Sequence, residues 1–86
     1  MATLYIVNHP SALADCLELA GDQDAVLLIQ EGVRASIEDQ GRQIFALKED
    51  RELRSIEAMP GRNVELVDYA GFVKLTEAHS PIVSWR

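Results

Sequence analysis

An unbroken run of five apolar residues, at positions 25–29, stands out in the first half of the chain. A strand with one face in water alternates apolar and polar residues, whereas a strand covered on both faces need not. Asp24 and Glu31 lie close to its two ends, and the run is far too short to cross a membrane as a helix. We therefore interpret it as a buried parallel strand, with Gln30-Glu31-Gly32 leading away from its carboxyl end.

Four further segments have the character of strands, because they are rich in β-branched and aromatic residues or alternate polar with apolar positions. They span residues 3–7, 43–47, 63–67 and 82–85. Helices are predicted between them from apolar spacings of three and four residues. This alternation predicts an α/β fold, with a mainly parallel sheet and helices on both faces in flavodoxin-like layering.

The helix boundaries can be predicted from capping residues. Ser11 is suited to cap the first helix, and Gly21 to end it in a left-handed conformation. A short helix is expected over residues 32–37, and a mostly charged one over 50–56, with Leu53 and Ile56 pointing inward. Asp68 is a suitable N-cap for the last helix.

The length and composition limit the organisation and the class of partner. The 86 residues suffice for a single domain, residues 1–86, yet 48% of them are hydrophobic. We expect part of this apolar surface to lie under a partner or a second copy, although a tightly packed monomer is the alternative. The net charge is −6 and no Lys or Arg precedes Arg34, so direct nucleic-acid binding is not expected.

Sequence motifs for cofactors are missing. The first strand runs into Asn8-His9-Pro10 and not into a glycine-rich phosphate loop, so no cofactor is expected, although a flavin could bind without a motif. A single cysteine leaves no internal disulfide and no self-contained zinc site. Without a leader or a long apolar segment, a cytoplasmic location away from membranes is expected.

Three residues are candidates for chemistry, each with a simpler interpretation. Cys16 is the one soft nucleophile, but its helical register suits a small buried hydrophobe, and Asp15 beside it disfavours a thiolate. His9 follows the first strand, where it could act as a base or serve only as a loop residue. The carboxylate of Glu31 could orient a partner, or its negative charge could simply stabilise the first turn of the next helix.

The carboxyl-terminal stretch from residue 67 to 85 resembles the end of the DsrH/TusB family. The matching residues are Asp68-Tyr69, Phe72-Val73, Leu75-Thr76, His79 and Trp85. The run at 25–29 with its following Glu31, Gly32 and Val33 also resembles the apolar strand of this family. Members usually carry Ser-Pro and an aromatic residue after the first strand, whereas this chain has His9-Pro10-Ser11-Ala12.

The resemblance implies the smallest subunit of a bacterial sulfur-relay complex. Such a subunit would assemble with two related small subunits as a dimer of heterotrimers, in which a partner carries the main sulfur-bearing cysteine. One branch of the family supports 2-thiolation of the tRNA wobble uridine. Cys16 matches a position at which some members have cysteine and others do not.

We therefore expect a mainly structural, non-catalytic subunit that supports tRNA thiolation, with Tyr69, Phe72 and Trp85 as interface anchors. Two alternatives stay open. In the first, the complex handles sulfur during dissimilatory sulfur oxidation, with Cys16 as a persulfide carrier. In the second, the chain is a homo-oligomeric binding module without a relay role, and the sequence leaves open whether the isolated chain associates with itself.

Overall fold

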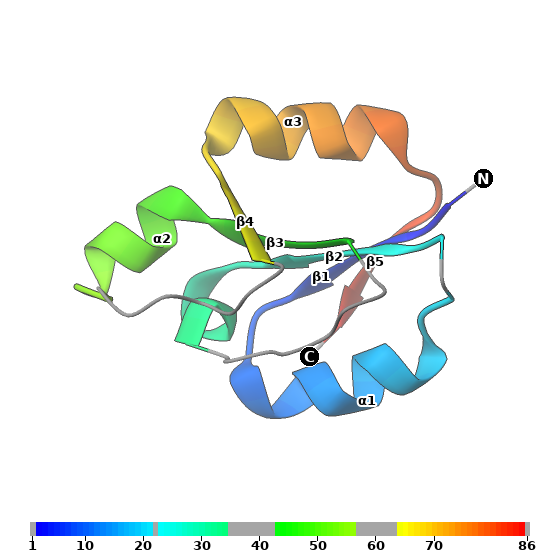
Figure 1. Cartoon of the computed structure of the whole chain (residues 1–86), viewed down its shortest axis with the longest axis horizontal. Helices are drawn as coiled ribbons and strands as arrows, with labels where there is room; N and C mark the ends of the chain where they lie inside the picture. The colour runs from blue at the N-terminus through cyan, green and yellow to red at the C-terminus, as the bar shows by residue number, and fades with distance from the viewer. Residues whose placement is uncertain (1, 22, 35–42, 57–63, 86) are drawn as a thin grey trace.

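A five-stranded, all-parallel sheet forms the centre of the protein in the computed structural model (Figure 1). The structure describes residues 2–21, 23–34, 43–56 and 64–85, with Trp85 described in its backbone alone. The strands are β1 (Leu4–Val7), β2 (Ala25–Leu28), β3 (Gln43–Leu47), β4 (Val64–Val67) and β5 (Ile82–Trp85). Their order across the sheet is β4-β3-β2-β1-β5.

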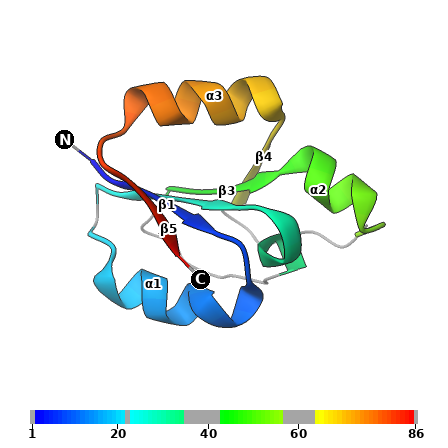
Figure 2. The same cartoon turned by 180° about the vertical axis from the view of Figure 1, so that it is seen from behind.

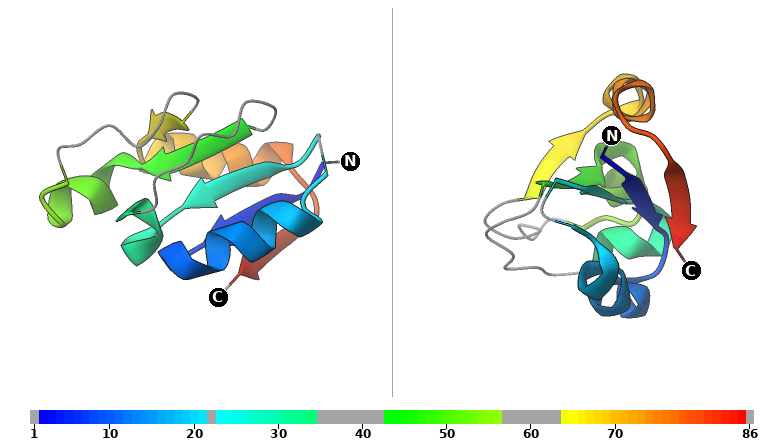
Figure 3. Two further views of the ribbon diagram at one scale, coloured as in Figure 1. Left: turned by 60° about the horizontal axis from the view of Figure 1, so that its bottom comes forward. Right: turned by 90° about the vertical axis from the view of Figure 1, so that its right-hand side faces the viewer.

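Helices cover both faces of this sheet, as the sequence predicts. The helical segments are η1 (Pro10–Ala12), α1 (Leu13–Leu19), η2 (Gln30–Arg34), α2 (Lys48–Leu53) and α3 (Tyr69–Ala78). Helices α1 and α3 lie on opposite faces, which Figure 2 and the right-hand view of Figure 3 show clearly. The short segments η2 and α2 instead follow the carboxyl ends of β2 and β3.

The apolar core is divided by the sheet into two layers, and β2 contributes to both. All four of its residues are completely buried. Val26 and Leu28 belong to the cluster that contains residues of α1, whereas Ala25 and Leu27 belong to the cluster against which α3 packs. A strand buried on both faces has no need of a polar alternation. The predicted buried strand is therefore confirmed.

The strand order indicates that a ligand site, if present, lies at the carboxyl edge of the sheet. From β1 the chain builds the sheet outward through β2, β3 and β4, and then returns to place β5 on the other side of β1. The topological switch therefore lies between β1 and β5. In open parallel sheets, ligand sites form outside the carboxyl ends of the strands at such a switch.

The helix boundaries differ from the predicted ones in three places. The first helical segment is capped by His9 and not by Ser11. Helix α1 ends at Leu19, followed by Ala20 in an extended conformation, and the φ angle of Gly21 is not in the left-handed region. Helix α2 spans Lys48–Leu53 and leaves Leu53 78% exposed, so the prediction that Leu53 points inward was wrong.

Parts of two predicted segments cannot be compared with the structure. The predicted helix over 32–37 overlaps the 3-10 segment η2, and its end beyond residue 34 lies outside the described residues. The same holds for the start of the predicted strand at residue 63.

Candidate functional site

The segment that follows β2 packs directly on the end of β1. The backbone N–H of Ile29 donates to Val7 O at 3.0 Å, and that of Gly32 donates to Ile29 O at 2.8 Å. A Cβ added at Gly32 would lie only 2.3 Å from Val7 O. Glycine is therefore required here by the close approach of two backbone segments.

Gln30, at the start of η2, is held in an unusual backbone conformation by a residue of α2. Its φ angle is 50°, in the left-handed region that residues other than glycine seldom adopt. Its backbone N–H donates to Asp50 Oδ2 at 2.6 Å. Asp50 thus links the carboxyl ends of β2 and β3.

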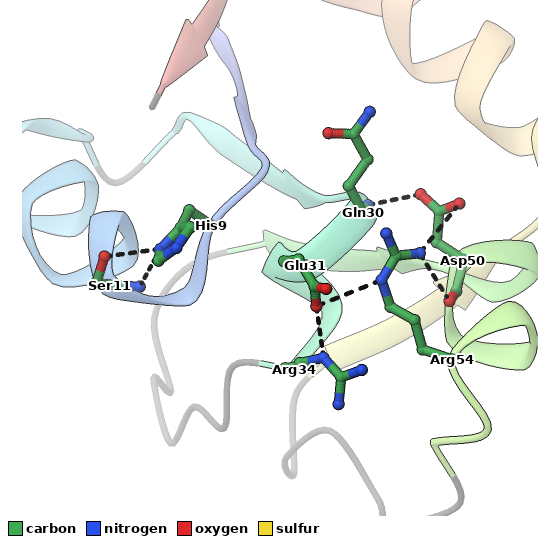
Figure 4. Close-up of polar contacts among 7 residues, drawn as sticks. All are labelled: His9, Ser11, Gln30, Glu31, Arg34, Asp50 and Arg54. Carbon is green, nitrogen blue, oxygen red and sulfur yellow. Dashed lines mark hydrogen bonds and ion pairs between the residues drawn. The ribbon is translucent and has the colours of Figure 1, made fainter.

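Three ion pairs extend this link into a network, which we call the carboxyl-edge network (Figure 4). It comprises Gln30, Glu31, Arg34, Asp50 and Arg54. Glu31 Oε2 accepts from Arg34 Nε and also lies 3.4 Å from Arg54 Nε. Arg54 Nη1 donates to the backbone oxygen of Asp50 at 3.4 Å. The hydrogen bond from Arg34 lowers the pKa of Glu31 from its ordinary value.

Exposure limits what these ion pairs contribute to stability. The side chains of Glu31 and Arg34 are 50% and 51% exposed, so their pair is worth little energetically. Asp50 and Arg54 are much less exposed, at 13% and 19%. The network therefore acts mainly by fixing η2 against α2, because its partly buried members bind backbone groups of both.

His9 and Ser11 lie at the same edge, beside this network (Figure 4). The Nδ1 atom of His9 lies 2.7 Å from Ser11 Oγ and accepts from the Ser11 backbone N–H at 3.3 Å. The pair caps η1. Among the contacts of the described residues, no carboxylate orients the His9 ring as the third member of a catalytic triad.

A further link joins α2 to the start of α3. Glu49 Oε2 accepts from the backbone N–H of Tyr69 at 3.2 Å. Asp68 caps the same helix, because its Oδ1 accepts from the N–H of Gly71 at 2.8 Å, which confirms its predicted role. Two carboxylates thus serve the free N–H groups at the beginning of α3.

Cys16 is buried and does not reach the surface of the protein. It lies in α1, has no solvent-exposed surface and belongs to the apolar cluster between α1 and the sheet. A thiol transfers sulfur only if a partner can reach it. In this conformation Cys16 contributes to packing, and the chain has no second thiol, because Cys16 is its only cysteine.

The three predicted interface residues lie in different surroundings. Tyr69 is 55% exposed at the start of α3, whereas Phe72 is half-buried and packs against the cluster of Leu4, Ala25 and Leu27. Trp85 ends β5, in register with Val7 of β1. Phe72 therefore anchors its own helix to the sheet, and of these residues Tyr69 is the one shown to leave apolar surface available.

The carboxyl-edge network was missed by the sequence interpretation. Its contacts between Gln30 and Asp50 join residues 20 positions apart, and no local pattern specifies such a contact. The available signal was the strand order itself, since residues that follow adjacent parallel strands meet at one edge. Among the described residues, no group of His, Cys, Asp or Glu could hold a metal ion.

The fold and the site together define a class: small single-domain α/β proteins with a parallel sheet and apolar side chains left on the surface. No helix in the described part of the chain is long and apolar enough to span a membrane. At the level of sequence, the family model for DsrH like protein matches residues 8–82.

Curated relatives agree with this match, two of them over nearly the whole length. Protein TusB of Enterobacter sp. (strain 638) is 35% identical over 95 residues, covering 95% of this chain and 99% of the relative. Protein TusB of Salmonella enteritidis is 35% identical over 94 residues, with 95% and 99% covered. For Protein TusB of Photorhabdus laumondii the identity is 37% over 71 residues, with 72% and 75% covered.

The chain belongs to the DsrH/TusB family, which confirms the resemblance seen in the sequence. Membership of this family implies a subunit of a sulfur-relay complex.

Proposed function

We propose that the protein is a cytoplasmic subunit of a relay complex that supports 2-thiolation of the tRNA wobble uridine. It assembles with two related small subunits as a dimer of heterotrimers, and its own role is mainly structural. The observation that carries the proposal is the similarity to TusB proteins over 95% of this chain and 99% of the Enterobacter relative.

A structural role is supported by the placement of the thiol. Cys16 has no exposed surface, and the chain contains no second cysteine that could take over a persulfide. A carrier must present its sulfur to a donor and then to an acceptor. The sulfur-bearing cysteine of the proposed relay therefore lies on a partner subunit.

The assembly role is supported by apolar surface on α3. Tyr69 and Val73 are four residues apart, so they share one face of the helix, and each is 55% exposed. Phe72 and Leu75 face the sheet instead. We propose that Tyr69 and Trp85 contribute to contacts with the partner subunits, and that Phe72 holds α3 in the position those contacts need.

The tRNA branch is tested in cells that lack the gene for this chain. The fraction of 2-thiolated wobble uridine in digested tRNA is measured by liquid chromatography and mass spectrometry. Loss of the modified nucleoside, restored by the wild-type gene, is expected. Unchanged thiolation in the deletion strain would contradict the tRNA function and favour sulfur oxidation or a separate binding role.

The structural role is tested in the same strain with Cys16→Ala. This small apolar replacement suits a buried position, so we expect it to restore thiolation to near the wild-type level. If Cys16→Ala leaves the complex assembled but abolishes thiolation, Cys16 carries sulfur and the structural role is wrong. The control is Asp15→Ala, which changes an exposed neighbour on the same helix.

A further inference from the structure

The start of the first helical segment depends on an unusual capping residue. His9 has an extended backbone, with φ −145° and ψ 133°, and stands directly before Pro10. Asn, Asp, Ser and Thr are the residues that ordinarily provide a cap, because their oxygen atoms accept hydrogen bonds at any physiological pH. Histidine offers a ring nitrogen instead, and its capacity to accept depends on protonation.

Each backbone N–H group in this first turn has its own acceptor. Pro10 has no N–H group, and the N–H of Ala12 donates to His9 O at 3.1 Å. The N–H of Leu13 donates to Pro10 O. The acceptor for Ser11 is His9 Nδ1, at 3.3 Å.

The geometry fixes which ring nitrogen of neutral His9 carries the hydrogen. A backbone N–H can only donate, so His9 Nδ1 must accept, and the hydrogen of the neutral ring is on Nε2. Ser11 Oγ, at 2.7 Å from the same nitrogen, then donates its hydroxyl hydrogen to it. An imidazolium ring has hydrogens on both nitrogens and can accept neither bond.

We propose that His9 is a pH-sensitive cap that holds the start of the segment formed by η1 and α1 while its ring is neutral. Protonation places a hydrogen on Nδ1, which releases the Ser11 N–H to water and turns the Ser11 hydroxyl into an acceptor. The added positive charge is also unfavourable at a helix N-terminus. The cap is therefore present while the ring of His9 is neutral and is lost when the ring is protonated.

Charged groups also lie on the elements that contact η1. Helix α1 carries Asp15 in its first turn, and η2, which contacts η1, carries Glu31 and Arg34. These last two are paired with each other. Since η1 contacts η2, loss of the cap loosens the carboxyl edge at the end of β1.

The test is an NMR titration of the full ¹⁵N-labelled chain between pH 5 and 8. Long-range ¹H–¹⁵N spectra identify the protonated ring nitrogen of His9. Solvent-exchange measurements give the protection factor of the Ser11 amide. The protection factor is used because it is corrected for the intrinsic pH dependence of amide exchange. We expect neutral His9 to carry its hydrogen on Nε2. We expect the protection factor to fall about fivefold on acidification, the factor that corresponds to loss of one ordinary cap.

Two variants separate the cap from other effects of pH. His9→Asn keeps an acceptor that does not titrate, so its protection factor should stay high throughout. His9→Ala has no acceptor, so its protection factor should stay low throughout, and the control His79→Gln should behave as the wild type. The proposal is overturned if neutral His9 carries its hydrogen on Nδ1, or if the protection factor of the Ser11 amide does not change when His9 becomes protonated. It is also overturned if this protection factor falls on acidification in the His9→Asn variant.

Discussion

Gly32 offers the sharpest test of the packing at the carboxyl edge. The change is Gly32→Ala, which adds one methyl group to a buried position. The new Cβ would lie 2.3 Å from Val7 O, 3.1 Å from Val7 C and 3.3 Å from Asn8 C. Real Cβ atoms essentially never come closer than 3.0 Å to such atoms, so η2 and the end of β1 must separate by at least the difference of 0.7 Å.

This separation is costly because all the crowded atoms belong to the backbone. Val7 O also accepts the N–H of Ile29 at 3.0 Å, so moving it strains the connection between β1 and the end of β2. Extra methyl groups in closely packed sites typically cost about 1–3 kcal/mol. We expect Gly32→Ala to lower the free energy of unfolding by about 2–3 kcal/mol, because no flexible side chain can move aside.

Urea unfolding followed by circular dichroism measures this change. The matched control is Gly21→Ala, where the added Cβ has its nearest contact at 3.4 Å, with the carboxylate of Asp24. The control should stay within about 0.5 kcal/mol of the wild type. Suppose that Gly32→Ala also stays within that limit and that the slope of its unfolding free energy against urea concentration is unchanged. The close approach of η2 to β1 is then not as described.

Three further predictions concern the core, the amino end of the sheet and the thiol. Leu27→Ala should lower the free energy of unfolding by about 3 kcal/mol, because Leu27 is completely buried, and a loss below 1 kcal/mol in urea unfolding would refute this burial. Hydrogen bonds from two backbone N–H groups, of Thr3 and Gly21, lower the pKa of Asp24. Asp24→Asn should therefore be less stable than the wild type above about pH 4. The difference in stability between the two proteins should shrink as the pH falls through the lowered pKa of Asp24. A difference in thermal midpoint that stays constant down to pH 2 would show that the charge of Asp24 is not the cause. Cys16 should react with a thiol reagent at least tenfold more slowly in the native protein than in urea, and equal rates would contradict its burial.

The sequence predicts those parts of the fold that depend on local patterns. The apolar run at 25–29 identifies the strand that is buried on both faces, and the alternation of strands and helices gives the parallel sheet. Asp68 is found in its predicted cap position because a capping carboxylate bonds a backbone group only three residues away. Such short-range signals need no knowledge of the tertiary structure.

The features that the sequence does not predict depend on contacts or on competition between neighbours. Ser11 and His9 both have side chains able to cap a helix, and their order around Pro10 gives the cap to His9. The spacing of Leu53 and Ile56 suggests two inward residues, but α2 ends at Leu53 and leaves it exposed. The predicted anchors share aromatic character, which does not distinguish the half-buried Phe72 from the exposed Tyr69.

The family assignment and the placement of the site come from different kinds of signal. Residues near the carboxyl terminus carry the resemblance to DsrH/TusB proteins, and the family model confirms it over residues 8–82. The carboxyl-edge network instead arises where the ends of β2 and β3 meet, and only the three-dimensional structure brings Asp50 to Gln30.

The central proposal, that this chain works as one subunit of a relay complex, is tested most directly by native mass spectrometry. The protein is isolated with a small affinity tag from its own cells at its natural level. We predict a particle that contains two copies of this chain and two copies of each of two related small subunits. A particle composed of this chain alone would contradict the proposal and favour a homo-oligomeric module.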